Sequence, residues 1–390
     1  MPARKLPEGT SYQLPQQVRE RDAVLLRLQE LFDAWGYQRV ELPALEAYDP
    51  EHPAASQSFK LIDQGNRLLA LRSDFTPALS QLVRQHFRQA AAGADSLRLQ
   101  YRGPTWLASG ADLAHSREFT QVGIELVGVS NARADAELIH LARESVRAVG
   151  LTPRIELGNP ALVKALFDEA GVPAGARDDL AGAIDRKDAA MLRAQLQELK
   201  LPSEFEAALS LIPDLYGDKD VLERARAGLP WDSTRAELDR IEAILDQFED
   251  HSELLLDLGV ARRLSYYTGV TFRAYTFDYG QPLLGGGRYD GALLPYAAGF
   301  SLGLDRLLLA SPGREQRTIP TILSGDDTAA RLLRRNGYTV VRALATDDAH
   351  LRAEAATAGA SYVVAQGRVQ SVGTEASLLH ALQDLLDGSR

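Results

Sequence analysis

The chain has 390 residues, which suggests two or three domains at about 150 residues each. Its net charge of −10 disfavours a dedicated nucleic-acid binder, and its lack of cysteine excludes thiolate catalysis and cysteine-ligated metals. No apolar run reaches the roughly 18 residues of a membrane span, and the first residues lack the apolar core of a signal peptide. We therefore expect a cytoplasmic protein that has no membrane contact.

The first part of the chain mixes helices and strands. Apolar residues at a spacing of about 3.6 predict a helix over residues 16–35, and alternation predicts a strand over 38–42. The turn-like sequence Asp63-Gln64-Gly65-Asn66 predicts a hairpin between residues 59–62 and 68–71. Further helices are expected over 77–89 and 132–149, and further strands over 96–103, 118–128 and 154–157.

The pattern changes twice beyond that point. Residues 159–250 read as short helices broken by glycine and proline, a helical insert between two strand-rich halves. Strands return at 253–258, 265–274 and 276–279; the glycines at 285–287 then read as a breaker and a helix is expected from residue 300. Residues 1–312 are thus α+β with a largely antiparallel sheet. Residues 313–390 alternate strand and helix, which predicts a small, mainly parallel α/β domain.

Two segments place polar residues where a sheet would bury them. Asp74 ends a strand, where the ordinary interpretation is an N-cap for the next helix. Gln121, Gly123 and Glu125 share one strand face, because side chains alternate with a period of two. The ordinary interpretation of that face is exposure to solvent.

Two further segments combine arginine, tyrosine and glycine. Arg262 beside Tyr266 and Tyr267 offers a planar fork for a carboxylate next to an aromatic wall, or forms a tyrosine-rich strand with surface arginines. Residues 285–291 hold four glycines that let a ligand approach the backbone, or form a plain hairpin turn. Taken together, the acids, the arginine, the amide and the phenol of the four segments suit a free amino acid with a basic side chain.

The order of these segments resembles histidyl-tRNA synthetase, a class II aminoacyl-tRNA synthetase. The chain opens with LPEGT at residues 6–10, and residues 36–43 and 101–128 resemble motifs 1 and 2. Residues 262–267 resemble the histidine-specific motif RGLDYY, residues 286–291 read GGRYDG, and residues 299–307 resemble motif 3. The resemblance extends over the first domain, 1–312, and implies the class II fold.

The resemblance also implies a histidine pocket. It assigns the α-amino group to Asp74, Thr76 and Gln121, the imidazole to Glu125 and Tyr266, the carboxylate to Arg262, and the pocket lining to Tyr267 and Tyr289.

The sequence departs from the synthetase pattern where ATP would react. Leu107 stands where motif 2 supplies a phosphate-binding arginine, and Ser109 stands in place of its glutamate. Losing one contact to a charged transition state typically costs about 3 kcal/mol or more. In the RGLDYY-like segment, Arg263 replaces the glycine and Ser265 the aspartate. Residues 313–390 contain nine bases and nine acids, so they lack the basic excess expected of a tRNA-binding domain.

With these departures, the sequence resembles a paralogous family, the regulatory subunits of ATP phosphoribosyltransferase. That resemblance implies a non-catalytic subunit that activates a short catalytic subunit in the first step of histidine biosynthesis and mediates feedback inhibition by free histidine. It implies a self-dimer through motif 1 and a hetero-octamer, with no tRNA, no cofactor, no metal of its own, and Mg²⁺ only at the catalytic partner. The alternatives are an active histidyl-tRNA synthetase and another class II-like ligase.

Overall fold

The computed structural model describes residues 5–50, 55–108, 116–261, 267–277, 279–311, 321–345, 348–372 and 378–388. Its contacts divide the chain into two compact units, Met1–Pro312 and Gly313–Arg390. Each unit has hydrophobic clusters of its own. Within the described part of the chain, no helix is long and apolar enough to cross a bilayer.

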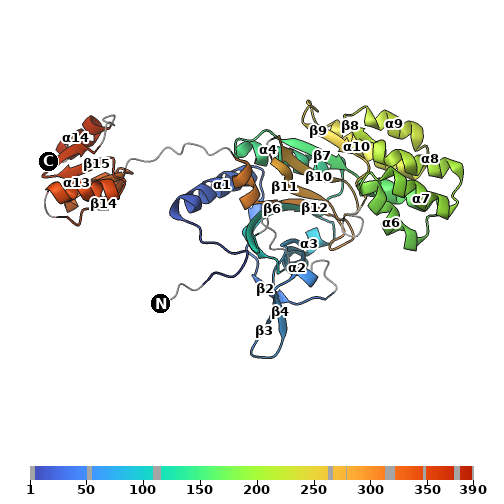
Figure 1. Cartoon of the computed structure of the whole chain (residues 1–390), viewed down its shortest axis with the longest axis horizontal. Helices are drawn as coiled ribbons and strands as arrows, with labels where there is room; N and C mark the ends of the chain where they lie inside the picture. The colour runs from blue at the N-terminus through green and yellow to red at the C-terminus, as the bar shows by residue number, and fades with distance from the viewer. Residues whose placement is uncertain are drawn as a thin grey trace. The chain divides into compact units, whose positions relative to one another are not determined.

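A nine-stranded sheet organises the first unit (Figure 1). Only the pairs β1–β5 and β7–β9 are parallel, so the largely antiparallel sheet that the sequence predicts is confirmed. In spatial order the strands are β1 (Gln38–Arg39), β5 (Leu97–Trp106), β6 (Glu118–Val127), β12 (Ala297–Gly303), β11 (Tyr279–Arg288), β10 (Thr271–Thr276), β7 (Arg154–Gly158), β9 (Leu254–Asp257) and β8 (Tyr216–Gly217).

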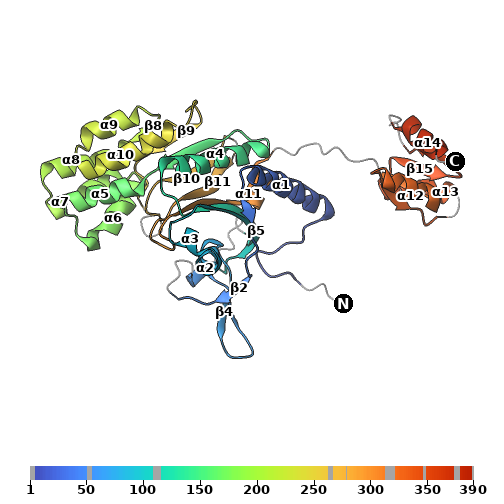
Figure 2. The same cartoon turned by 180° about the vertical axis from the view of Figure 1, so that it is seen from behind.

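Helices cover both faces of this sheet (Figures 1 and 2). Helices α1 (Pro15–Ala34) and α4 (Ala132–Ala148) pack with Val122, Ile124 and Leu126 of β6 in the main core. Helix α2 (Thr76–His86) belongs to a second core that includes Val127 of β6 and residues of β5. Two short helices, α3 (Arg88–Ala91) and α11 (Leu304–Ala310), complete this layer arrangement. The alternation along β6 therefore sends its side chains into two different cores.

Two expectations for the glycine-rich part of the sheet were wrong. The glycines at 285–287 lie inside β11 rather than breaking it, and β12 continues to Gly303 where a helix was expected from residue 300. The reason is close packing: a Cβ atom on Gly286 would lie 2.2 Å from the carbonyl oxygen of Gly299. Glycine is therefore required by the neighbouring strand and does not end this one.

The chain between β7 and β9 is helical apart from β8, and it lies at one end of the sheet (Figure 1). We call residues 160–245 the helical unit. It comprises α5 (Pro160–Glu169), α6 (Ala174–Asp185), α7 (Ala189–Leu199), α8 (Ser203–Leu211), the 3₁₀ helix Ile212–Asp214, α9 (Val221–Gly228) and α10 (Asp232–Leu245).

A three-stranded sheet projects from the first unit in the order β2-β4-β3 (Figure 1). Its strands are β2 (Leu45–Ala47), β3 (Lys60–Ile62) and β4 (Leu68–Leu71), and the short 3₁₀ helix Ala55–Gln57 precedes β3. The predicted hairpin is confirmed, with Asn66 at a φ of 58° in its turn. The strand register places one set of apolar side chains on the same face, which we call the apolar face: Leu45, Ala47, Leu61, Leu69 and Leu71.

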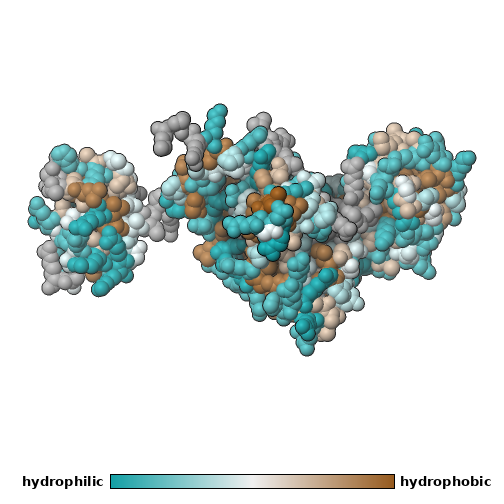
Figure 3. Space-filling view, turned by 90° about the horizontal axis from the view of Figure 1, so that it is seen from below, coloured by the Kyte–Doolittle hydropathy of each residue, from teal (hydrophilic) through white to brown (hydrophobic). Residues whose placement is uncertain are grey.

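The apolar face and the hairpin tip leave hydrophobic side chains in solvent. Leu45 is 52% exposed, Leu61 41% and Ile62, near the tip, 71%. Seen from below, apolar groups gather near the centre of the view, where this hairpin points toward the viewer (Figure 3). An apolar patch of this kind commonly marks a protein-binding surface.

The second unit is a small α/β fold. Its sheet has the order β14-β13-β15-β16, in which β14 (Thr339–Arg342), β13 (Thr321–Ser324) and β15 (Tyr362–Ala365) are parallel. The mainly parallel arrangement was predicted; the antiparallel edge strand β16 (Arg368–Ser371) was not. Helices α12 (Asp327–Arg335) and α14 (Leu379–Asp387) pack in one cluster, and α13 (Asp348–Thr357) packs in the other.

Candidate functional site

One face of the central strands is hollowed because glycines stand beside large polar residues. Glu125 of β6 lies opposite Gly299 of β12, and Tyr101 of β5 lies opposite Gly123 of β6. A Cβ atom on Gly123 would come within 2.4 Å of the Tyr101 ring, so the ring lies directly over that backbone. The glycines leave room for the carboxyl group and the phenol at the surface of the sheet.

A cavity of about 70 Å³ opens at this position, and we call it the glutamate cavity. Five of the eight residues expected in the histidine pocket line it: Asp74, Thr76, Glu125, Tyr267 and Tyr289. The remainder of its lining comes from Tyr101, Gly285, Gly299, Phe300 and Ser301.

Of the other three expected residues, two lie outside the described residues and one does not line the cavity. Arg262 and Tyr266 lie outside the described residues. Gln121 is buried on the same face of β6 but is not among the described residues that line the cavity. Its side-chain oxygen is buried and accepts no hydrogen bond from the part of the chain that the structure describes.

Tyr101 is the lining residue that the sequence pattern did not single out. It belongs to the stretch that resembles motif 2, but its position over Gly123 depends on the register between β5 and β6. Its ring stacks on Phe75 at 4.5 Å between centroids, with an interplanar angle of 14°. Knowledge of the β5–β6 register would have identified Tyr101 as a lining residue, because it lies directly opposite Gly123.

Glu125 is the central group of the cavity. Tyr289 donates a hydrogen bond to its Oε2 at 2.8 Å, and Thr76 donates one to its Oε1 at 3.1 Å. The pKa of Glu125 is raised to about 8, chiefly by burial and in part by the nearby charge of Asp74, while the hydrogen bonds from Tyr289 and Thr76 oppose the shift. At neutral pH this raised pKa favours the protonated form of Glu125, since an ionised carboxylate is poorly solvated there.

The segment that carries Asp74 is fixed by a buried arginine. Arg72 is 4% exposed and donates hydrogen bonds to the carbonyl oxygens of Leu42 at 2.6 Å, Pro43 at 3.0 Å and Pro104 at 3.1 Å. Its guanidinium also lies 4.0 Å from the centre of the Phe75 ring. Arg72 thus joins three separate backbone segments beside the cavity.

The position corresponding to the phosphate-binding arginine is apolar. Leu107 follows β5, and its backbone N–H donates to the carbonyl oxygen of Arg117 at 3.0 Å. Ser109 lies outside the described residues. The motif 3 aspartate, Asp305, accepts hydrogen bonds from Arg21 and from the backbone of Thr120, so it serves the packing of α1 on β6.

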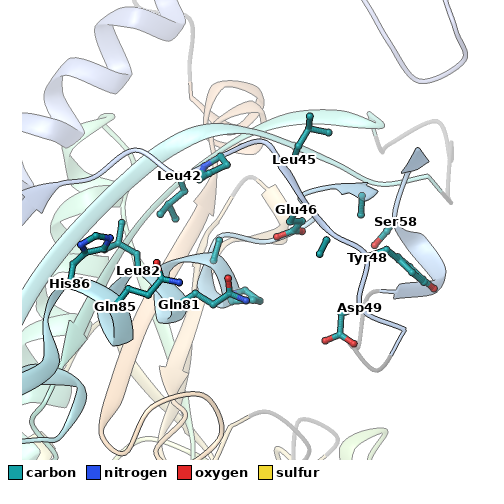
Figure 4. Close-up of a pocket in the computed structure, with 15 residues that line it drawn as sticks. Leu42, Leu45, Glu46, Tyr48, Asp49, Ser58, Gln81, Leu82, Gln85 and His86 are labelled. Carbon is teal, nitrogen blue, oxygen red and sulfur yellow. The ribbon is translucent and has the colours of Figure 1, made fainter. Parts of the chain in front are cut away.

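A second, larger cavity of about 410 Å³ lies between β2 and α2, and we call it the α2 cavity (Figure 4). Its lining includes Leu42 and Leu45, the carboxyl groups of Glu46 and Asp49, and polar side chains of α2 such as Gln81. Burial raises the pKa of Glu46, and the charge of Asp74 raises it further. None of the described residues expected in the histidine pocket lines this cavity.

The sheet, its glycine-lined hollow and the carboxyl group within it define a class II synthetase-like protein of the histidyl-tRNA synthetase type. The family model described as histidyl-tRNA synthetase matches residues 9–307. The structure of histidyl-tRNA synthetase from Nostoc sp. superposes with a TM-score of 0.79, covering 99% of both chains at 18% identity, which supports the fold alone.

Curated relatives specify the family further. The ATP phosphoribosyltransferase regulatory subunit of Thermus thermophilus is 45% identical over 336 residues, 86% of this chain and 91% of the relative. That of Deinococcus radiodurans is 41% identical, covering 89% and 85%. A Bacillus halodurans structure described as an ATP phosphoribosyltransferase regulatory subunit/histidyl-tRNA synthetase superposes with a TM-score of 0.80 at 27% identity, covering 92% and 97%. The chain belongs to the ATP phosphoribosyltransferase regulatory subunit family.

Proposed function

We propose that this chain is a cytoplasmic, non-catalytic regulatory subunit that binds free histidine in the glutamate cavity. In this proposal it activates a short catalytic subunit of ATP phosphoribosyltransferase and transmits feedback inhibition by histidine. The observation that carries the proposal is Glu125, a fully buried acid held by Tyr289 and Thr76 beside a second acid, Asp74. Two acids around a small cavity favour a ligand with two basic nitrogens.

Histidine supplies complementary groups. Its imidazole can pair with Glu125, and its ammonium group can pair with Asp74, which lies in the same cavity lining. The carboxylate is assigned to Arg262, with Tyr266 at the imidazole and Gln121 at the ammonium group, on the strength of the resemblance. The unsatisfied side-chain oxygen of Gln121 supports that role, because a buried acceptor without a donor costs about 1–3 kcal/mol.

The absence of a basic group at Leu107 supports binding without catalysis. An aminoacyl-adenylate forms only when the charge that develops on the α-phosphate is stabilised, and a leucine side chain offers no charge or donor. The alternative of an active synthetase predicts histidine-dependent exchange of pyrophosphate into ATP by the pure protein. We expect no exchange, and we expect that Leu107→Arg alone does not create it, because Ser109 also departs from the motif.

The exposed apolar side chains of the three-stranded sheet are the basis on which we propose where this chain contacts its partners. We propose that two copies associate through the motif 1 region, where the apolar face and the α2 cavity adjoin. The dimer then assembles with the catalytic subunit into a hetero-octamer, and Mg²⁺ acts at the catalytic subunit alone. The chain itself needs no cofactor, no metal and no tRNA in this proposal.

Calorimetry with the full-length chain and L-histidine tests the proposal. Wild-type protein should bind, and Glu125→Ala should lose at least tenfold in affinity, about 1.4 kcal/mol. Glu156→Ala is the matched control, because Glu156 lies on β7 of the same sheet and is not among the residues lining the cavity. Unchanged affinity in Glu125→Ala would exclude this cavity as the sensor.

A second measurement tests the regulatory part. The catalytic subunit should be more active with this chain than without it, and histidine should reduce that activity. Inhibition requires that histidine bind the inactive assembly more tightly than the active one, because equal affinity shifts no equilibrium. Glu125→Ala should therefore still activate the partner while responding weakly to histidine. A mutant that remains fully inhibited would place the histidine site elsewhere.

A further inference from the structure

The end of β11 is held by a buried cluster of alternating charges. Arg288 is 4% exposed and Asp135 of α4 is 3% exposed. The Nε of Arg288 donates to Asp135 Oδ1 at 2.8 Å, and its Nη1 donates to Asp290 Oδ1, also at 2.8 Å. Tyr289 lies between the two cluster residues Arg288 and Asp290 in the chain. The cluster therefore fixes the backbone on both sides of the tyrosine whose hydroxyl reaches Glu125.

The helical unit supplies the fourth member of this cluster. Arg240 of α10 donates to Asp135 Oδ2 from Nε at 2.8 Å and from Nη2 at 2.5 Å. Each oxygen of Asp135 is thus occupied by a different arginine, one from α10 and one from β11. We call these four residues the Asp135 cluster: Asp135, Arg240, Arg288 and Asp290.

The helical unit also contacts the described segment that ends at Ala261, six residues before the cavity residue Tyr267. Asp185, at the end of α6, accepts a hydrogen bond from the backbone N–H of Ala261 at 3.3 Å. Lys187 lies 3.3 Å from Asp257, which in turn accepts a hydrogen bond from the N–H of Gly259. Ala261 immediately precedes Arg262 in the sequence. Two independent sets of contacts therefore connect the helical unit to segments that carry expected pocket residues.

We infer that Arg240 is a positioning residue for histidine recognition: through Asp135 and Arg288 it fixes Tyr289 against Glu125, and so makes the affinity for histidine depend on the helical unit. The inference rests on the histidine binding proposed above. It adds a role for a residue that lies in a different layer from the cavity and does not line it.

The charges of the cluster explain why Arg240 should affect histidine binding in a cavity that it does not line. Asp135 and Arg288 are buried, and a buried ion needs its partners because water cannot replace them. With Arg240 removed, Asp135 keeps only Arg288, which it already shares with Asp290, and its Oδ2 loses its partner. The carboxylate of Asp135 can rotate, Arg288 can follow it, and Tyr289 loses its fixed position.

A double-mutant cycle on the full-length chain, with L-histidine and calorimetry, tests this inference. Arg240→Gln should raise the dissociation constant between about twofold and thirtyfold. In a Tyr289→Phe background the same substitution should have almost no further effect, because the hydroxyl through which it acts is gone. Arg240→Lys keeps the charge and should restore part of the affinity.

Arg226→Gln is the matched control. Arg226 forms ion pairs with Asp239 and Glu242 inside the helical unit, and neither of these acids belongs to the Asp135 cluster, so its removal should leave histidine affinity unchanged. Circular dichroism verifies folding, and if Arg240→Gln does not fold, the cycle is run with Arg240→Lys.

Three results would overturn the inference: equal affinity in wild type and Arg240→Gln, an equal loss in Arg226→Gln, or an undiminished loss in the Tyr289→Phe background. A loss that adds fully to that of Tyr289→Phe indicates a general effect on folding. If the wild-type chain binds no histidine, the proposed function fails together with the inference, whereas normal wild-type binding with an unaffected Arg240→Gln removes the inference alone.

Discussion

Gly299 lies directly opposite Glu125, and a Cβ atom at position 299 would come within 1.9 Å of Glu125 Oε2. The same Cβ atom would lie 2.4 Å from the backbone oxygen of Ile124, so the strand as well as the carboxyl group would have to move. Glycine at this position is therefore a condition for the buried acid, and its replacement gives a direct test of the cavity.

Gly299→Ala should displace the Glu125 carboxyl group, reduce histidine affinity at least tenfold, and destabilise the fold by about 1–3 kcal/mol. Calorimetry and urea unfolding measure the two effects. Gly280→Ala is the control, because a Cβ atom there has no neighbour within 4 Å. Wild-type affinity in Gly299→Ala would mean that Glu125 is not required where the structure places it.

Glu125→Gln should change how stability depends on pH. The pKa of Glu125 is about 8 in the folded chain, against an ordinary 4.5, so the folded state binds a proton that the unfolded state has released between these values. Its contribution to stability is complete below pH 4.5 and falls as the pH rises toward 8. The wild type should therefore lose on the order of 4 kcal/mol across this range relative to Glu125→Gln.

Urea unfolding of the ligand-free protein at pH 5, 6.5 and 8 measures this difference. Parallel stability curves for wild type and Glu125→Gln would contradict the raised pKa. A Glu204→Gln variant serves as the control, since Glu204 is exposed in the first turn of α8.

Arg72→Met should destabilise the first unit by about 3 kcal/mol or more, because three carbonyl oxygens lose the guanidinium, itself buried, that donates to them. The exposed pair Arg67–Asp63 provides the comparison: the Arg67 side chain is 79% exposed, and Arg67→Met should cost less than about 1 kcal/mol. Equal effects of the two substitutions in urea unfolding would show that Arg72 does not hold the three segments together.

Histidinol should bind more weakly than histidine by about 1–3 kcal/mol or more, because it lacks the carboxylate assigned to Arg262 and would leave that charge unpaired. Competition calorimetry against L-histidine measures the difference. In Arg262→Ala the preference for histidine over histidinol should shrink. Equal binding of both ligands by the wild-type chain would remove the assignment of Arg262.

A chain ending at Ser311 should still bind histidine, because all the described residues that line the glutamate cavity lie in Met1–Pro312. The same titration as for the full-length chain provides the measurement. Folded protein without histidine affinity would show that residues beyond 311 contribute to the site. The balanced charge of residues 313–390 leads us to propose a structural or assembly role for them.

Local sequence patterns predicted most of the elements but not all of the site. The hairpin before Asp74 and strands β5 and β6 follow from turn chemistry and alternation, which depend on near neighbours in the chain. The positions of Tyr101 over Gly123 and of Gly299 under Glu125 depend on strand register. Asp135 and Arg288 are 153 residues apart, so no local pattern relates them.

Glycine was the main source of error. In β11 and β12, glycine marks the close approach of neighbouring strands. A prediction from local sequence alone instead interprets glycine as the end of an element. The resemblance assigned Glu125 to the histidine pocket, and the structure places Glu125 in the wall of the glutamate cavity. The resemblance gave no indication that Arg240 of the helical unit is joined to Arg288 of β11 through a shared aspartate.

The exposed apolar side chains of the three-stranded sheet, on the apolar face and at the hairpin tip, link the proposed assembly to stability. A lone protomer exposes Leu45, Leu61 and Ile62 to water. Any protein that covers them binds only the folded state, and by mass action it adds free energy to that state in proportion to the logarithm of its concentration. In the proposed assembly the melting temperature should therefore rise with the concentration of the partner that covers these side chains.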